Sequence, residues 1–171
     1  LVTPLIELPE RWYTDGVKII TIHAQRNIPG AKSIDYIPAT IALKQARRKQ
    51  AIEAVYVDRD ECVLEGTTSN LFIFRGDRIM TPGRAILNGI TRKVALRLAA
   101  NAYQTEIRDI ARDELYAADE VFITGSNREI VPVVKVDQKT IGDGKPGKHT
   151  KKMMEAFAAY MTKEAQSHKH R

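Results

Sequence analysis

The chain has 171 residues, of which 43% are hydrophobic and 28% charged, as expected for one globular domain with a sizeable core. Its net charge is +6, but the basic residues gather in 44–50 and 149–171 and only 6% of residues are aromatic, so we expect solvated helix faces and no nucleic-acid partner. The sequence contains no apolar run of about 18 residues, which argues against a membrane segment, and its single cysteine, Cys62, fits a reducing, cytoplasmic setting.

The first third of the sequence predicts alternating elements after a short lead-in. Residues 1–15 contain two prolines and are interpreted as the end of an interdomain linker. The β-branched run at 16–26 predicts a strand, and the prolines and glycine of 28–38 predict a loop. Strong helix formers at 39–51 predict a helix, which a short buried strand at 53–58 follows.

The middle of the sequence predicts a β-rich unit and then an amphipathic helix. Residues 62–82 have the pattern of three strands joined by turns, the second turn at Gly76. Residues 89–102 predict a helix, with Val94 and Leu98 on the same apolar face as Ile90. A strand over 105–110 and a short helix over 111–118 are predicted next.

The last third predicts two strands, 119–127 and 129–137, and a C-terminal helix. Pro132 cannot donate a ladder hydrogen bond, so it predicts an edge strand or a bulge. Because hairpins and helices are mixed without a βαβ repeat, we predict an α+β domain over 16–165, with a polar tail at 166–171. The final helix is predicted to place one apolar stripe in the core: Met154, Phe157, Ala158 and Met161.

Two segments have residues suited to binding an anion. In 87–92, Gly89 allows a close turn, and the free N–H groups of a helix start lie beside the Thr91 hydroxyl. The segment 124–127 ends a strand with a glycine and further donors. A glycine and a threonine at a helix start more often serve only as a cap, so neither segment is specific by itself, and the acid at Glu65 has no assigned role from the residues alone. No spacing of histidines and cysteines predicts a metal site.

Four segments in this order resemble a known family: 31–46, 64–74, 81–92 and 120–133. Together they are similar to the larger, C-terminal domain of the fold type IV (class IV) pyridoxal-phosphate aminotransferases. That family includes branched-chain and D-amino acid aminotransferases and aminodeoxychorismate lyases. Its members usually begin with a smaller N-terminal domain, which is absent here, so the resemblance implies a fragment or a trimmed relative.

The resemblance implies a role for each matching residue. Lys32 corresponds to the lysine that bonds to the cofactor aldehyde and moves the substrate proton. Glu65 corresponds to the carboxylate that keeps the pyridine nitrogen protonated, and Tyr36 to a tyrosine near the cofactor 3′-oxygen. The remaining positions are Leu87 against the ring, Gly89, Ile90 and Thr91 at the phosphate, Ser126 and Asn127 in a second phosphate loop, and Thr67 and Thr68 on the substrate side.

The function implied is pyridoxal 5′-phosphate-dependent transfer of an amino group between an amino acid and a 2-oxo acid, by a homodimer. Tyr36 favours a branched-chain substrate. The alternatives are a D-amino acid aminotransferase, an aminodeoxychorismate lyase, and an inactive fragment that lacks half of the site. Two positions depart from the family pattern: Asn88, where branched-chain enzymes often have proline, and Arg128, where many members have a small residue.

Overall fold

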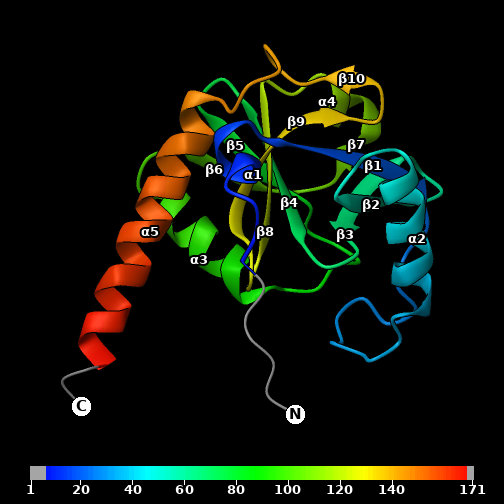
Figure 1. Cartoon of the computed structure of the whole chain (residues 1–171), viewed down its shortest axis with the longest axis horizontal. Coiled ribbons are helices and arrows are strands. Elements are labelled where there is room, and N and C mark those ends of the chain that lie inside the picture. The colour runs from blue at the N-terminus through cyan, green and yellow to red at the C-terminus, as the bar shows by residue number, and fades with distance from the viewer. Residues whose placement is uncertain (1–6, 169–171) are drawn as a thin grey trace.

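A computed structural model describes residues 7–168, and within them a mixed sheet forms the centre of the molecule (Figure 1). The strands are β1 (Val17–His23), β2 (Glu53–Val57), β3 (Cys62–Gly66), β4 (Asn70–Arg75), β5 (Arg78–Thr81), β6 (Gln104–Ile107), β7 (Ile110–Ala111), β8 (Glu120–Gly125), β9 (Glu129–Val136) and β10 (Lys139–Thr140). The helices are α1 (Arg11–Thr14), α2 (Ile37–Arg48), α3 (Ile90–Ala99), α4 (Arg112–Tyr116) and α5 (Lys148–His168).

The sheet order combines parallel and antiparallel neighbours. It runs β6-β5-β4-β8-β9-β1-β2-β3-β7, and β10 pairs with β9. The pairs β1–β2, β1–β9 and β5–β6 are parallel, whereas the hairpins β4–β5 and β8–β9 are antiparallel. This mixture confirms the predicted α+β class, because a repeated βαβ unit would give parallel pairs throughout.

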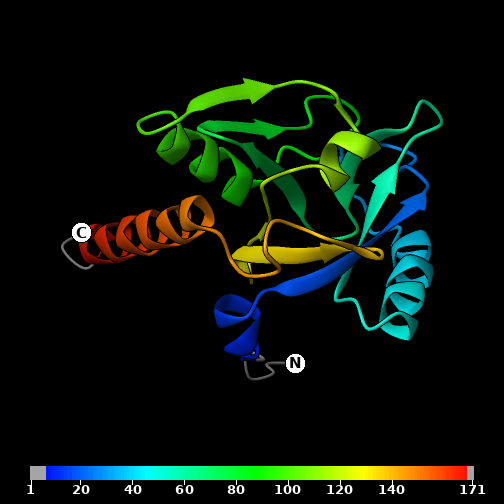
Figure 2. The ribbon, with the colours of Figure 1, turned by 90° about the horizontal axis from the view of Figure 1, so that it is seen from above.

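Both faces of the sheet are buried. In β4, Leu71 and Ile73 belong to a first core, whereas Phe72 and Phe74 belong to a second core on the opposite face. Helices α3 and α5 pack against the half of the sheet that contains β8, and α2 packs against β1 and β2. Figures 1 and 2 show α3 and α5 at one side of the molecule and α2 at the other, with the sheet between them. The helices therefore flank the sheet.

A bulge in β3 determines where Glu65 lies. Val57 pairs with Val63, and Val55 pairs with Gly66, so one residue separates the paired positions in β2 and two residues separate them in β3. Val63 packs in the first core. In a regular strand Glu65, two residues later, would share that face, but the extra residue breaks the alternation and Glu65 lies on the opposite side.

The position of Pro132 differs from the edge position that the sequence predicts. Strand β9 lies between β8 and β1, and Pro132 pairs with Phe122. The pairing of β1 with β9 begins at Val17 and Val133, one residue past the proline, so β1 does not need the missing N–H. The alternative prediction, a bulge, agrees better with the structure, because the register between β1 and β9 shifts directly after Val17.

The buried stripe of α3 also differs from the prediction. Ile90 is 76% exposed, and Val94 and Leu98 are only partly buried. The buried side chains are instead Thr91, Arg92, Ala95 and Ala99. The alanines allow α3 to lie close to both β8 and α5, so close approach of the helix decides the buried face more than the largest apolar residues do.

The predicted stripe of α5 is correct at its start and wrong at its end. Met153 and Phe157 are buried and Met154 is partly buried against the second core. Ala158 is exposed and Met161 is 44% exposed, because the end of the helix extends past the sheet (Figure 1). None of the helices in residues 7–168 has the length and apolar character needed to cross a membrane.

The two ends of the described chain are partly structured. Within the predicted linker 1–15, Arg11–Thr14 forms α1, and Trp12 and Tyr13 pack against the first core. Within the predicted tail 166–171, residues 166–168 continue α5. Residues 1–6 and 169–171 lie outside the described residues.

Candidate functional site

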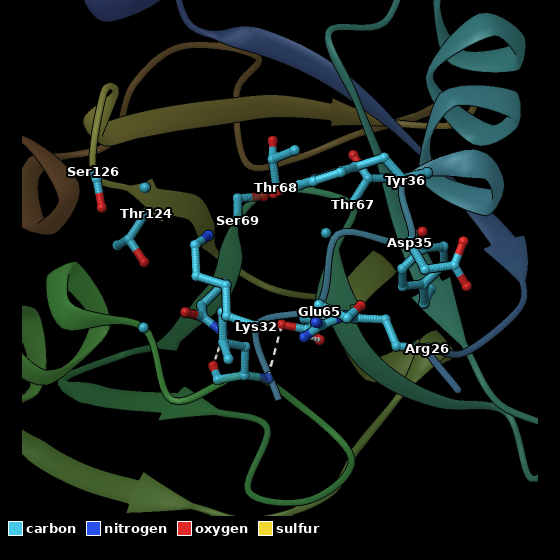
Figure 3. A pocket seen from close by; sticks show the side chains of 18 of the residues that line it. Arg26, Lys32, Asp35, Tyr36, Glu65, Thr67, Thr68, Ser69, Thr124 and Ser126 are labelled. Atoms are coloured by element: carbon cyan, nitrogen blue, oxygen red, sulfur yellow. Dashed lines mark hydrogen bonds and ion pairs between the residues drawn. The ribbon is translucent and has the colours of Figure 1, made fainter. Parts of the chain in front are cut away.

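A cavity of about 300 Å³ opens where the loop before α2, the β3–β4 turn and the start of α3 meet (Figure 3). Ten of the residues singled out from the sequence line it: Lys32, Tyr36, Glu65, Thr67, Thr68, Leu87, Gly89, Ile90, Thr91 and Ser126. Asn127 does not line the cavity. Segments far apart in the sequence therefore converge on one cavity.

Glu65 is the buried acid of this cavity. The residue is 4% exposed, and its carboxylate accepts a hydrogen bond from the Leu87 N–H at 2.9 Å. The Arg26 guanidinium lies 3.4 Å from the other carboxylate oxygen. Burial raises the pKa of Glu65, and the Leu87 N–H and Arg26 only partly oppose this effect. A cationic N–H group from a ligand would therefore find an acceptor that is poorly solvated.

The raised pKa of Glu65 predicts a pH dependence of stability in the ligand-free protein. Between the ordinary value of 4.5 and the higher native pKa, the native state binds more protons than the unfolded state. The free energy of unfolding contributed by Glu65 is therefore fully present below about pH 4.5 and is lost as the pH rises through the native pKa.

Thermal melts of the wild type and Glu65→Gln at stepped pH would measure this loss. We expect the melting temperature of the variant to increase relative to that of the wild type as the pH rises above about 4.5. A difference in melting temperature that stays constant with pH would contradict the assignment of a raised pKa to Glu65.

The loop before α3 is held by buried polar side chains. Arg92 is 4% exposed and donates to the Pro82 carbonyl at 2.9 Å and to the Asn88 side chain at 3.2 Å. Asn70 donates to the Leu87 carbonyl at 2.8 Å. A Cβ at Gly89 would stand 2.4 Å from the Asn70 side-chain oxygen, so only glycine fits there without a shift.

The start of α3 supplies unpaired donors to the cavity. Gly89 is the N-cap residue, and no side chain of the described residues caps the helix. Gly89, Ile90 and Thr91 all line the cavity. The first N–H groups of a helix lack intrahelical partners and carry the positive end of the helix dipole, so this arrangement favours an anion such as a phosphate.

The loop that carries Lys32 is fixed by a residue that the sequence did not single out. Arg26 follows β1 and donates to the carbonyls of Pro29, at 2.9 Å, and Ala31. Lys32 itself is exposed, and Figure 3 shows its side chain projecting into the space between Glu65 and Thr124. Arg26 thus connects the loop of Lys32 to the carboxylate of Glu65. A basic residue at the end of the predicted strand 16–26 was its only signal in the sequence.

The hydroxyl groups of the β3–β4 turn are directed toward Glu53. Thr67, Thr68 and Ser69 all donate to this carboxylate, which is 0% exposed. Thr67 and Thr68 line the cavity, but their hydroxyls are already paired. The only signal for Glu53 was an acid at the start of a short apolar strand, and reasoning from the sequence missed it.

Comparison with known proteins supplies the family. A family model described as amino-transferase class IV matches residues 1–136. The chain belongs to the class IV aminotransferase family. A D-alanine aminotransferase of Bacillus licheniformis is 37% identical over 156 residues, which are 89% of this chain and 55% of that protein. A branched-chain-amino-acid aminotransferase of Pseudomonas aeruginosa is 37% identical over 161 residues, 90% of this chain and 52% of that protein.

Solved class IV structures share the fold. The branched-chain amino acid aminotransferase of Escherichia coli superposes with a TM-score of 0.83 at 31% identity, covering 89% of this chain and 53% of that chain. A second branched-chain enzyme, from T.th. and with pyridoxamine 5′-phosphate, gives a TM-score of 0.79 at 30% identity, covering 90% and 53%. This class IV chain therefore spans about half the length of the relatives it matches.

Metal ligation finds no support in the described residues. No group of three or more histidine, cysteine, aspartate or glutamate side chains in residues 7–168 is placed to hold a metal ion. The polar groups that converge on the cavity are an amine, a carboxylate, hydroxyls and main-chain donors, which suit an organic ligand that carries a phosphate.

Proposed function

We propose that the protein to which this chain belongs is a pyridoxal 5′-phosphate-dependent transaminase. It moves an amino group between an amino acid, with a branched-chain type favoured, and a 2-oxo acid. The observation that carries the proposal is the gathering of Lys32, the buried Glu65 and the uncapped start of α3 in one cavity. A lysine, a buried acid and a phosphate site are the three features that this cofactor requires.

The residues of the cavity fit the cofactor. Its phosphate suits the N–H groups at the start of α3 and the turn at Ser126. Its ring nitrogen suits Glu65, and its aldehyde suits the Lys32 amine. The hydroxyl of Thr124 lies in the cavity wall, is buried, and has no hydrogen-bond partner among the described residues. An unpaired buried hydroxyl beside an open space supports the binding of a polar ligand there.

Each side chain then has a chemical task. When bound, the cofactor supplies an electron-accepting ring that stabilises negative charge on the substrate Cα. The Lys32 amine accepts the α-proton of the amino acid and returns it to complete the transfer. Glu65 holds a proton at the ring nitrogen, and the Leu87 N–H and Arg26 orient its carboxylate. Burial shields the Glu65 carboxylate from water, whereas Lys32 is exposed.

The substrate class rests on two observations. Tyr36 lines the cavity at the position where branched-chain enzymes have a tyrosine, and several relatives are branched-chain aminotransferases. The D-alanine aminotransferase relative supports a D-amino acid as the second candidate.

An assay with separate donors tests the function. The natural full-length protein, supplied with pyridoxal phosphate, is offered L-leucine, D-alanine or aminodeoxychorismate, the first two with 2-oxoglutarate. We expect glutamate to form with L-leucine. Glutamate from D-alanine alone would select the D-amino acid alternative, and pyruvate from aminodeoxychorismate would select the lyase. No product from any donor would support the inactive alternative.

We also propose a cytoplasmic homodimer. Several large apolar side chains near the cavity are exposed, and burial against a second copy would remove them from water. They are Ile28, Ile34, Tyr36, Ile37 and Ile41, with Ile34 94% exposed. Sedimentation of the full-length protein as a monomer at micromolar concentration would contradict the dimer.

The cytoplasmic location is supported by Cys62, which is a free thiol, as expected in a reducing compartment.

A further inference from the structure

Glu53 is a fully buried carboxylate that joins two turns of the cavity wall. It stands at the start of β2 and is 0% exposed. One oxygen accepts from the N–H groups of Ala54, at 3.0 Å, and Thr67, at 3.2 Å, and from the Thr67 hydroxyl. The other oxygen accepts from Thr68 at 2.9 Å, Ser69 at 3.1 Å and the Arg128 guanidinium at 3.1 Å.

Arg128 brings the second turn into this network. It follows β8, its side chain is 14% exposed, and its guanidinium lies 5.9 Å from the centre of the Trp12 ring. The two turns also touch directly, because a Cβ at Gly125 would stand 3.4 Å from the Thr68 carbonyl oxygen. The turn 67–69 and the turn 126–128 are therefore held together by one buried ion pair.

The network reaches only one side of the cavity. None of the hydrogen bonds of Glu53 within the described residues goes to Lys32, Leu87 or the start of α3, and the turn at Ser126 is the one proposed cofactor contact that the network reaches. All of its side-chain donors lie on the two turns. A disturbance of Glu53 should thus move the wall formed by 67–69 while the cofactor contacts at Lys32, Glu65 and the start of α3 remain.

We propose that Glu53, paired with Arg128, is a positioning residue that fixes the substrate-side wall of the cavity. This inference rests on the proposed transaminase function. It assigns a purpose to the three adjacent hydroxyls: they anchor the turn to Glu53, and the substrate meets the surface that this anchoring creates. It also assigns a purpose to Arg128, a charged residue at a position where a small one would leave the Glu53 carboxylate without its counter-charge.

The network requires a carboxylate and not merely a polar side chain. In Glu53→Gln, one oxygen becomes an NH₂ group with the same shape. If this group replaces the first oxygen, it faces the N–H groups of Ala54 and Thr67, which cannot accept. If it replaces the second, it faces the Arg128 guanidinium, which cannot accept either. The hydroxyls of Thr67, Thr68 and Ser69 can rotate to accept from this group, but the main-chain N–H groups and the guanidinium cannot. Either orientation therefore opposes donors and should displace one of the two turns.

The test compares Glu53→Gln with the wild type in the full-length protein loaded with pyridoxal phosphate. We expect KM for the amino-acid donor to rise by at least about tenfold, while the absorption band of the bound cofactor stays in place. Hydrogen exchange should become faster in peptides that cover 66–69 and 126–129. Adding Arg128→Met removes the opposed guanidinium and should restore part of the lost affinity.

The matched control is Glu120→Gln. Glu120 is also a buried acid, 9% exposed, and accepts from the N–H groups of His149 and Thr150 at the start of α5, which does not line the cavity. This variant should lose melting temperature with KM unchanged. A KM within twofold of wild type in Glu53→Gln, or an equal KM rise in Glu120→Gln, overturns the proposal.

Two further measurements test the role of Glu53: KM in Thr68→Val, and hydrogen exchange in Glu53→Gln compared with Glu120→Gln. If Glu53→Gln does not fold, Thr68→Val removes one donor without burying a new polar group, and an unchanged KM in that variant counts against the proposal. If the wild type shows no transamination, the proposed function fails. Hydrogen exchange in Glu53→Gln against Glu120→Gln then still decides whether Glu53 fixes the two turns.

Discussion

Replacing Lys32 with alanine is expected to lower transamination by at least about 10³-fold and to remove the absorption band that borohydride bleaches in the loaded protein. The physical reason is that the Lys32 amine serves both as the covalent partner of the cofactor aldehyde and as the carrier of the α-proton. Its side chain projects into the cavity that contains Glu65 (Figure 3). Absorption spectra and initial rates at saturating donor measure the two effects.

The control for Lys32 is Lys44→Ala. Lys44 is an exposed lysine of α2 that does not line the cavity, so both the band and the rate should match the wild type. A band that survives Lys32→Ala and is still bleached by borohydride would show that another amine bonds to the cofactor. That result would refute the role of Lys32.

Glu65→Ala is expected to reduce kcat by about 10²–10³-fold, with a much smaller loss of cofactor affinity. The carboxylate holds a proton at the ring nitrogen, and this proton matters most when negative charge develops on the substrate. The cofactor keeps its contacts with Lys32 and with the start of α3, so binding should weaken less than turnover. Single-turnover rates and a cofactor titration separate the two quantities.

Glu65→Gln separates the charge of Glu65 from its shape. Glutamine can still accept a hydrogen bond from the Leu87 N–H, which preserves the loop before α3. We therefore expect Glu65→Gln to bind cofactor nearly as well as the wild type and to lose turnover nearly as severely as Glu65→Ala. Turnover within a few fold of wild type in both variants would contradict the role given to Glu65.

The sequence was sufficient for most of the elements and insufficient for their packing. Period-two alternation and turn residues predicted the hairpins because those signals are local. The missing N–H of Pro132 predicts an edge strand or a bulge, but whether that N–H is needed depends on where the neighbouring β1 begins to pair. Periodicity puts Ile90 on one apolar face with Val94 and Leu98, yet the close packing of α3 buries the side with Ala95.

The candidate site likewise contains residues that sequence motifs identify and residues whose roles only the packing of the chain reveals. Glu65 and Lys32 could be singled out only through the resemblance of their surrounding motifs, since neither residue type is unusual by itself. Glu53 and Arg26 escaped notice, and Arg128 stood out only as a departure from the family pattern, because their roles depend on contacts across distant parts of the chain. Such contacts leave no periodic trace in the sequence.

The bulge in β3 has a consequence for engineering and for alignment of this chain. A point substitution between Val63 and Gly66 alters a side chain, but an insertion or deletion there alters how the residues of β3 pair with β2 and which side chains fill each face. Removing Leu64 would leave Glu65 as the single residue between Val63 and Gly66, still opposite Val63, but it would take an apolar side chain out of the core beside Tyr56. The number of residues in this short strand is therefore as much a part of the site as their identities.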